Sequence, residues 1–284
     1  MNFASDLALE RREVRPGAPG IGYKKEDGGI GTWERVTVTT SAGAESIGRP
    51  TGCYDTLTLP PLAELSPGEI EDAKDQVARE LCALFEHNRV SPGRILVVGL
   101  GNAGLTPDAV GPETAARVHA TMQISRRDPG FFAGLECSEI AVLIPGVCDV
   151  TGIESAETVL GICEQIEPDA VICIDSLASR SPERLGRTIQ FSDTGIFPGS
   201  GTGSCALPID QRITGVPVFA IGMPTVINSR VFVEDFATRV GVSVPKEEKN
   251  AKPLFVSPRD IFSMVKSASE IIAGGIDQAF GVFF

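Results

Sequence analysis

Two aspartates occupy positions where carboxylates could act together as acid and base. Asp108 lies in a Gly- and Pro-rich stretch after the apolar run at 94–100, and Asp175 follows the apolar run at 169–174. In a parallel α/β sheet both positions fall at the carboxyl ends of strands, where sites collect. Two carboxylates in one crevice cannot both ionise cheaply, so such a pair can hold one proton and hydrolyse a bond with an activated water.

Each aspartate also has a structural interpretation. Asp108 is suited to cap a helix at 109–123, because aspartate is among the best capping residues. Asp175 is equally suited to end a strand and to accept backbone N–H bonds there. Composition and position alone leave the functional and the structural interpretations open.

Histidine and cysteine usage narrows the chemistry. His87 and His119 are the only histidines, and both lie in segments with helical patterns, so a histidine triad or a histidine-rich zinc site is not expected. The seven cysteines form no C-x-x-C pair and are odd in number, which predicts reduced, buried residues. They are Cys53, Cys82, Cys137, Cys148, Cys163, Cys173 and Cys205. We therefore predict no metal ligand and no cofactor.

The glycines Gly99, Gly101 and Gly104 have the G-x-G-x-x-G spacing of a dinucleotide-binding loop. Such a site needs a helix that begins in the loop and an acidic residue at the end of the next strand. Pro107 delays the helix, and the next apolar run ends at 144–146 without an acidic residue. The glycines are predicted to shape a tight exit from the strand instead.

The tripeptide Asp193-Thr194-Gly195 matches the one found in pepsin-type aspartic proteases. Those enzymes use two copies on all-β lobes, whereas this chain has one copy in an α/β pattern. We therefore predict that Asp193 is a loop or strand-end residue.

The elements that must position these side chains follow from hydrophobic periodicity. Alternating residues predict strands at 32–40 and 53–59, and Ser66, Pro67 and Glu69 predict a capped helix that runs to His87. Further along, we expect strands at 94–100, 138–146 and 169–178, with helices at 110–123 and 154–167 between them. That order predicts right-handed crossovers and a three-layer α/β/α fold with a mostly parallel sheet.

The C-terminal half continues with strands at 187–193 and 216–223, separated by a Gly/Ser-rich loop at 195–203. A charged linker is expected at 246–252. Ser257 as N-cap and Pro258 at the first helical position predict a long helix over 257–280.

Size and charge limit the possible partners. The 284 residues suit a single α/β domain over 1–284, and the net charge of -12 argues against binding to nucleic acid. No run approaches the ~20 apolar residues of a membrane span, and the first residues lack the order of a secretory signal. A cytoplasmic protein that does not bind membranes is expected.

Several blocks of this sequence resemble the germination protease family, the endopeptidases of spore-forming bacteria that degrade small acid-soluble spore proteins. The blocks occur in order as "TPDAVGP", "PGVCDVTGIE", "IDSLASRSPER", "TIQFSDTGIFPGSGTG" and "PVFAIGMPTV". The resemblance extends to both ends of the chain, through "SDLALE" and "SPRDIFSMVKSASEIIAGGIDQAF". It covers nearly the whole sequence.

This resemblance implies an α/β/α fold like that of the hydrogenase-maturation endopeptidases, in the phosphorylase/hydrolase-like group. It implies an atypical aspartic protease whose two aspartates are Asp108 and Asp175. It also implies a homotetramer of the spore core, made as a zymogen that sheds a short N-terminal propeptide, with small acid-soluble spore proteins as substrates.

Other residues are candidates for contacts with substrate. Asn102 and the glycine-rich loop with Gly199 and Gly201 are candidates to donate N–H groups to an oxyanion or peptide, although tight turns would use the same glycines. Arg180 and Arg184 are candidates to neutralise a carboxylate of the site or of the substrate, and a role on a helix surface is the alternative.

The N-terminal stretch "FASDL" at 3–7 resembles the family's substrate site, in which an acidic residue precedes a large apolar one. We therefore predict that the Asp6–Leu7 bond is a self-processing site and that about residues 1–6 form the propeptide.

Two features depart from the family. Phe197 replaces a histidine and so removes a possible proton carrier. The segment at 236–252 is much shorter than in typical members, and a flap or a subunit contact of the tetramer could be absent as a result.

Two other functions fit the same residues. In a metal-dependent endopeptidase of the hydrogenase-maturation type, Asp108 and Asp175 would bind a metal carried by the substrate. The lack of a nearby histidine argues against that function, because such metals usually attract imidazole. A non-catalytic protein could also hold a peptide in the same crevice.

Overall fold

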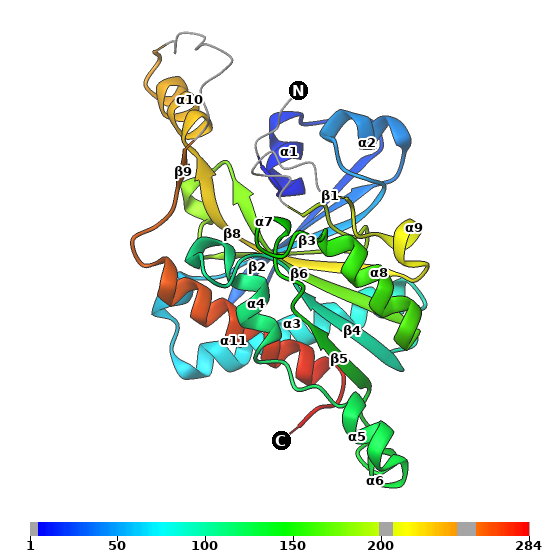
Figure 1. Cartoon of the computed structure of the whole chain (residues 1–284). Coiled ribbons are helices and arrows are strands. Elements are labelled where there is room, and N and C mark those ends of the chain that lie inside the picture. The colour runs from blue at the N-terminus through cyan, green and yellow to red at the C-terminus, as the bar shows by residue number, and fades with distance from the viewer. Residues whose placement is uncertain (1–4, 199–206, 243–253, 284) are drawn as a thin grey trace.

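A single mixed sheet with helices on both faces organises the molecule (Figure 1). The computed structural model describes residues 5–198, 207–242 and 254–283. The strands lie in the order β1-β2-β3-β7-β8-β6-β4-β5, and β9 pairs with β8. Their bounds are β1 (Ile21–Gly28), β2 (Gly31–Val38), β3 (Gly52–Thr58), β4 (Arg94–Gly99), β5 (Glu139–Leu143), β6 (Ala170–Ser179), β7 (Thr188–Ser192), β8 (Val218–Asn228) and β9 (Phe255–Val256).

The strands β5, β4, β6 and β8 pair in parallel and form the α/β core of the sheet. On the other side of β8, the strands β7, β3, β2 and β1 extend the sheet with antiparallel pairs. The predicted parallel arrangement of the three central βα units is therefore confirmed.

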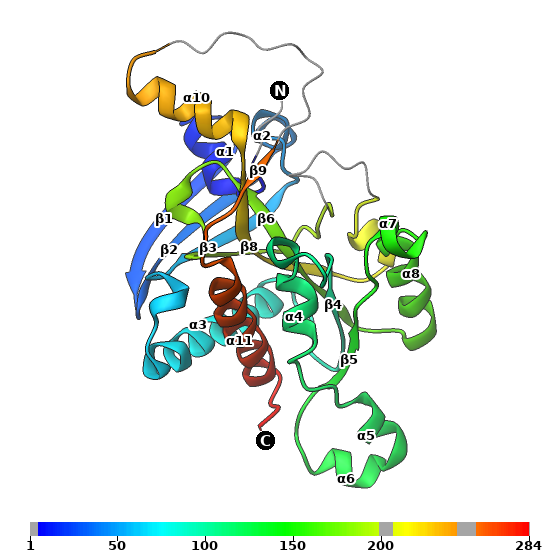
Figure 2. The ribbon, with the colours of Figure 1, turned by 60° about the vertical axis from the view of Figure 1, so that its left-hand side comes forward.

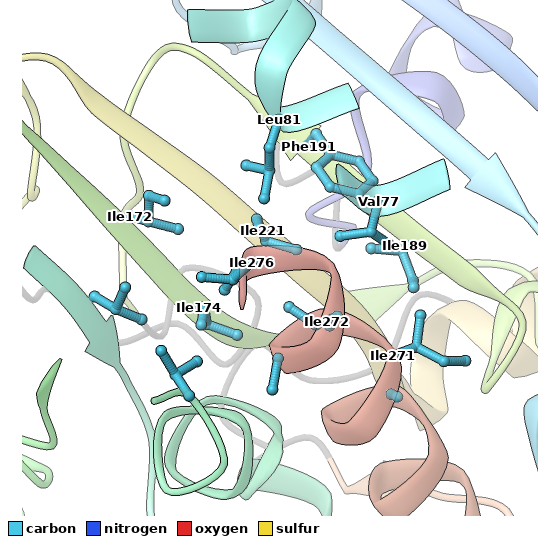
Figure 3. Packing of buried hydrophobic residues seen from close by; sticks show 14 of the residues in the cluster. Val77, Leu81, Ile172, Ile174, Ile189, Phe191, Ile221, Ile271, Ile272 and Ile276 are labelled. Carbon is cyan, nitrogen blue, oxygen red and sulfur yellow. The ribbon is translucent and has the colours of Figure 1, made fainter. Parts of the chain in front are cut away.

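Successive side chains of the parallel strands point to opposite faces of the sheet and pack into two separate hydrophobic cores. In β6, Ile172 and Ile174 belong to a core beneath three helices, α3 (Pro67–His87), α4 (Val110–Ala115) and α11 (Ile261–Ala279). Figure 3 shows side chains of α3 and α11 packed on this face of β6, β7 and β8. Val171 and Cys173 point to the opposite face, where α8 (Ser155–Ile166) closes the second core. The predicted three-layer α/β/α fold is confirmed.

The predicted start of α3 is also confirmed. The Oγ of Ser66 accepts a hydrogen bond from the N–H of Glu69 at 3.4 Å, and the Glu69 carboxylate accepts one from the N–H of Ser66 at 2.8 Å. This reciprocal pair satisfies two N–H groups that the first turn of the helix leaves without partners. The helix ends at His87, as the sequence predicts.

The predicted helix at 110–123 is wrong beyond its first turns. The helix α4 stops at Ala115, and the chain turns before α5 (Met122–Arg127) and α6 (Pro129–Ala133). Tertiary hydrogen bonds hold this turn: the N–H of His119 donates to Asp277 at 3.1 Å, and Thr121 bonds to Ser138 at 2.7 Å. These partners lie on α11 and beside β5, so local periodicity could not reveal them.

The start of the C-terminal helix also differs from the prediction. The N-cap of α11 is Asp260 rather than Ser257, and the helix begins at Ile261. The hydroxyl of Ser257 instead donates to the carbonyl oxygen of Thr225 at 3.1 Å, so Ser257 secures the segment that follows β9 to β8.

Several elements were missed by the sequence prediction. The strand β1 is almost entirely exposed and hydrophilic, because it is an edge strand whose backbone pairs with β2. The short helices α1 (Ala8–Val14) and α2 (Ser41–Ile47) pack against β2 and β3. The remaining elements are α7 (Cys148–Thr151), α9 (Gln211–Thr214), α10 (Ser229–Arg239) and the 3-10 turns η1 (Leu62–Glu64), η2 (Thr106–Asp108) and η3 (Pro182–Arg184).

Figure 2 shows that α10 and the α5–α6 pair project from opposite ends of the molecule. The predicted linker at 246–252 and most of the predicted loop at 195–203 lie outside the described residues. No helix in the described ranges is both long and apolar enough to cross a bilayer.

The cysteines are reduced in the described part of the chain but are not uniformly buried, which corrects the prediction. Cys163 and Cys173 are buried, whereas Cys82 and Cys148 are exposed and Cys53 and Cys137 are partly exposed. Cys82 lies inside α3 on its exposed side, and the other three lie at or beside the ends of strands or helices, where an apolar neighbourhood in sequence does not ensure burial.

Candidate active site

Asp108 ends a loop that leaves β4 and returns over the edge of the sheet. Gly101 makes this return possible, because its φ is +113° and a Cβ there would lie 2.2 Å from the carbonyl oxygen of Asp108. The 3-10 turn η2 then brings Asp108 back toward the start of the loop. The glycine serves a tight exit from the strand, as predicted.

The Asp108 carboxylate does not cap α4. The N-cap of α4 is Ala109, which makes no side-chain capping bond, and Oδ2 of Asp108 instead accepts the N–H of Asn102 at 2.8 Å. The capping interpretation of Asp108 is therefore wrong. The backbone N–H of Asn102 orients this carboxylate rather than a substrate oxyanion.

Asp175 lies within β6, because that strand continues to Ser179. It shares a face of the sheet with Val171 and Cys173, since side chains alternate along a strand. Its register partner on β8 is Gly222, and the side chain of Leu177 packs over that glycine. One carboxylate oxygen accepts the N–H of Ser176 at 2.8 Å.

The two aspartates face one cavity of about 570 Å³. Ser176 ties the two elements together, because its hydroxyl accepts the N–H of Val110 at 3.3 Å, at the start of α4. The carboxylates are close enough for the charge of Asp108 to act on Asp175. Strand order thus unites two residues that are distant in sequence.

Burial makes ionisation of this pair costly. Asp175 is 5% exposed, and its burial raises its pKa well above the usual range, with the negative charge of Asp108 raising it further. Burial also raises the pKa of Asp108, while the N–H of Asn102 partly opposes that shift. These are the conditions in which two carboxyl groups retain one proton between them.

The cavity wall also contains groups that the sequence did not single out. Tyr54 and Thr194 lie in it, and their hydroxyl groups are hydrogen-bonded at 3.1 Å. Thr225 is fully buried, and its hydroxyl has no hydrogen-bond partner among the described residues. A buried hydroxyl at the wall of a cavity is a candidate to bond a ligand; its sequence setting, an apolar strand, gave no signal.

Asp6 lies in the same cavity, which the sequence did not predict. Its N–H donates to the carbonyl oxygen of Ala178 at 2.8 Å, and its carboxylate accepts the N–H of Ala178 at 2.9 Å. Arg49 pairs with the carboxylate of Asp6 at 3.3 Å and donates to its carbonyl oxygen. Leu7, the next residue, is fully buried. The segment around the Asp6–Leu7 bond thus lies along the end of β6.

The structure does not bring Arg180 to the aspartates. Its guanidinium pairs with Asp235, and it lines a separate cavity of about 640 Å³. Arg184 likewise bonds Glu10 and Glu13. Both arginines therefore neutralise acidic groups elsewhere, which sequence spacing could not reveal.

The remaining predicted contacts lie in or beside the glycine-rich loop. Phe197 lines the cavity of Asp108 and Asp175. Gly199 and Gly201 lie outside the described residues. Asp193 directly follows β7, as predicted for a strand-end residue.

Comparisons with known proteins identify the family of this chain. The family model described as Germination protease matches residues 18–253. The chain is 33% identical to the germination protease of Clostridium perfringens, covering 98% of this chain and 95% of that protein. It is 34% identical to that of Caldanaerobacter subterraneus, over 98% of this chain and 94% of the relative. A germination protease of Bacillus subtilis is 34% identical over 88% of this chain and 70% of its own.

A solved [NiFe] hydrogenase maturation protease, HycI from Thermococcus kodakarensis, is a more distant match. It is 18% identical with a TM-score of 0.39, covering 70% of this chain and 99% of that chain. The three-layer architecture rests on the strand order and helix packing described above. The family match spans most of the sequence, and we conclude that this chain is a peptidase of spore germination that belongs to the germination protease family.

Proposed function

We propose that this protein is an aspartic endopeptidase that begins the degradation of small acid-soluble spore proteins by cutting after acidic residues. The observation that supports it best is the pair of carboxyl groups, Asp108 and Asp175, which face one cavity, and the negative charge of Asp108 helps to raise the pKa of Asp175. Carboxyl pairs of this kind supply both an acid and a base near neutral pH.

The environments of the two aspartates favour different protonation states. Asp175 is the more deeply buried of the two, and the charges of Asp108 and Asp6 further raise its pKa. Asp108 is less deeply buried and is stabilised as an anion by the N–H of Asn102. In our proposal Asp175 therefore carries the shared proton and Asp108 is the ionised base.

The proposed reaction proceeds in two steps. Asp108 takes a proton from a water molecule as its oxygen attacks the scissile carbonyl carbon, and Asp175 donates its proton to the carbonyl oxygen. The tetrahedral intermediate then collapses. Asp108 passes the proton it gained to the leaving amine nitrogen as the C–N bond breaks, and Asp175 recovers its proton from the hydroxyl group that becomes the new carboxyl. The pair returns to its starting state.

The contacts of Asp6 suggest how an acidic residue is held before the bond that is cut. Its carboxylate lies between Arg49 and the N–H of Ala178, at the edge of the cavity of Asp175. An arginine and a backbone N–H together favour a carboxylate over a neutral side chain. A substrate with Glu or Asp at the same place would make equivalent contacts.

The direct test is cleavage of a small acid-soluble spore protein by the purified chain. We expect fragments whose new C-terminal residue is Glu or Asp, identified by mass spectrometry. Excess chelator should not abolish cleavage, because the proposed chemistry uses carboxyl groups alone. Complete loss of activity in chelator would favour the metal-dependent maturation mechanism, and binding without fragments would favour a non-catalytic peptide-binding protein.

We also propose that the chain is a zymogen that processes itself at Asp6–Leu7. Incubation at mildly acidic pH, which helps the aspartate pair to hold its proton, should release residues 1–6 and leave Leu7 as the first residue, as seen by mass spectrometry. Asp6→Ala should slow this release at least about tenfold, because the contact with Arg49 is lost.

The matched control for processing is Asp27→Ala, which removes an exposed carboxylate on β1. It should leave the rate of processing unchanged. An intact Met1 in protein that digests spore-protein substrate would contradict the proposal.

We further propose that the protein works as a homotetramer in the cytoplasm of the spore core. Support for assembly comes from large apolar side chains left exposed near one end of the molecule. Phe236 on α10 is 60% exposed, Val240 directly after α10 is 56% exposed, and Leu254 before β9 is 74% exposed. Phenylalanine is enriched where subunits meet.

A further inference from the structure

A second group of reactive side chains lies behind the wall of the cavity. One ligand atom each from Cys53, His87 and Asp193 falls within 4.8 Å of the others, and Sγ of Cys53 lies 4.0 Å from Nε2 of His87. We call these three residues the Cys53 cluster. Tyr54 lines the cavity, and Cys53 precedes it on β3, so Cys53 points to the opposite face of the sheet.

Three separate elements build the Cys53 cluster. Cys53 lies near the start of β3, His87 is the last residue of α3, and Asp193 directly follows β7. The N–H of Cys53 donates to the Asp193 carboxylate at 2.8 Å. Gly52 permits this approach, because its φ is +150° and a Cβ there would lie 2.5 Å from the same carboxylate oxygen.

The three donor atoms match the preferences of zinc. Cysteine sulfur, histidine nitrogen and carboxylate oxygen are its usual ligands, in a tetrahedral arrangement. Bond lengths of about 2.3 Å to sulfur and 2.0 Å to nitrogen place those two atoms roughly 3.6 Å apart in such a site. The observed 4.0 Å between Cys53 and His87 needs a shift of only a few tenths of an ångström. His87 is exposed at a helix end, where its ring can make that shift.

A neighbouring side chain orients the Asp193 carboxylate. The side-chain amide of Asn88 donates to the second oxygen of Asp193 at 3.3 Å, so both oxygens are fixed in direction. Outer contacts of this kind are typical around metal ligands.

We propose that Cys53, His87 and Asp193 bind one zinc ion, with water as the fourth ligand. The ion fastens the C-terminal end of α3 to β3 and β7. Because Tyr54 and Thr194 directly follow two of the ligands and are bonded to each other in the cavity wall, the ion also stiffens that wall. This site is separate from Asp108 and Asp175 and does not depend on the proposed peptidase chemistry.

Cobalt titration of the full chain tests the site. Co²⁺ occupies zinc sites, and a bound thiolate gives a charge-transfer absorption that identifies sulfur as a ligand. We expect this absorption to saturate at one ion per chain and to be displaced by Zn²⁺. Cys53→Ser should abolish it, and His87→Gln and Asp193→Asn should each weaken binding at least about tenfold. Zinc should raise the melting temperature of the unaltered chain and not of Cys53→Ser.

The matched controls are Cys82→Ser, which removes an exposed cysteine on α3, and His119→Gln, which removes the other histidine. Both should bind cobalt like the unaltered chain. The proposal is overturned if the absorption survives in Cys53→Ser, is lost in Cys82→Ser, or does not appear. His87→Gln alters an exposed side chain at a helix end, so it remains folded and decides the matter even if Cys53→Ser does not fold.

Discussion

Asp175→Asn is expected to lower kcat for cleavage of a small acid-soluble spore protein by at least about 10³-fold. The amide has the shape of the carboxyl group but cannot deliver the acidic proton that the carbonyl oxygen needs. Fragment release followed over time by mass spectrometry measures the loss. Asp149→Asn is the control, because it removes an exposed carboxylate from the rim of the same cavity. It should retain activity within a few-fold of the unaltered chain.

The stability of Asp175→Asn separates a catalytic from a structural role. The folded protein binds the Asp175 proton more tightly than the unfolded chain does, because burial raises the folded-state pKa. The free energy of unfolding therefore falls as pH rises from about 3.9, the unfolded pKa, toward the folded value. Asparagine does not titrate. The variant should thus melt higher than the unaltered chain at neutral pH, and the difference should vanish near pH 4.

An inactive variant that also melts lower at every pH would show that Asp175 is needed for the fold rather than for the reaction. A fully active Asp175→Asn protein would refute the aspartate mechanism outright.

Asp108→Asn is expected to cause a loss of similar size, because the proposed base that activates water disappears. The double variant Asp108→Asn with Asp175→Asn should be no less active than either single variant, since residues that act as a unit have non-additive effects. Losses that instead multiply in the double variant would mean that the two carboxyl groups act independently.

Asp108→Asn should also change how Asp175 titrates. The negative charge of Asp108 helps to raise the pKa of Asp175, so removing it should lower that pKa. The measurement is the carboxyl carbon signal of Asp175 followed by NMR across pH, in the unaltered chain and in the variant. An unchanged pKa would show that the two groups are too far apart to share a proton.

Much of the fold was predictable because its signals are local. The capping box at Ser66 and Glu69 and the unbroken apolar runs of β4 and β6 depend on neighbours within a few residues. The edge strand β1 was not predictable, because its side chains are exposed and its backbone bonds to β2 define it. The end of α4 could not be predicted either, because the turn that follows it is held by a hydrogen bond to Asp277 of α11.

The candidate site likewise contains residues that the sequence predicted and residues that it did not. Position at the ends of two predicted parallel strands singled out Asp108 and Asp175, and the structure brings both to one cavity. Arg180 instead pairs with Asp235, which lies in a segment for which the sequence predicted no helix or strand. Asp6 enters the cavity only because its backbone pairs with Ala178 at the end of β6.

By itself, the sequence determined the α/β/α class and the family and singled out the two aspartates as candidates, because periodicity, caps and motifs are properties of neighbouring residues. Tertiary structure alone decided which distant groups meet. It buried Asp175 near Asp108 and so raised its pKa, and it placed Cys53, His87 and Asp193 together from three elements. The physical reason is that burial and the distance between charges depend on strand order and packing, which no local pattern encodes.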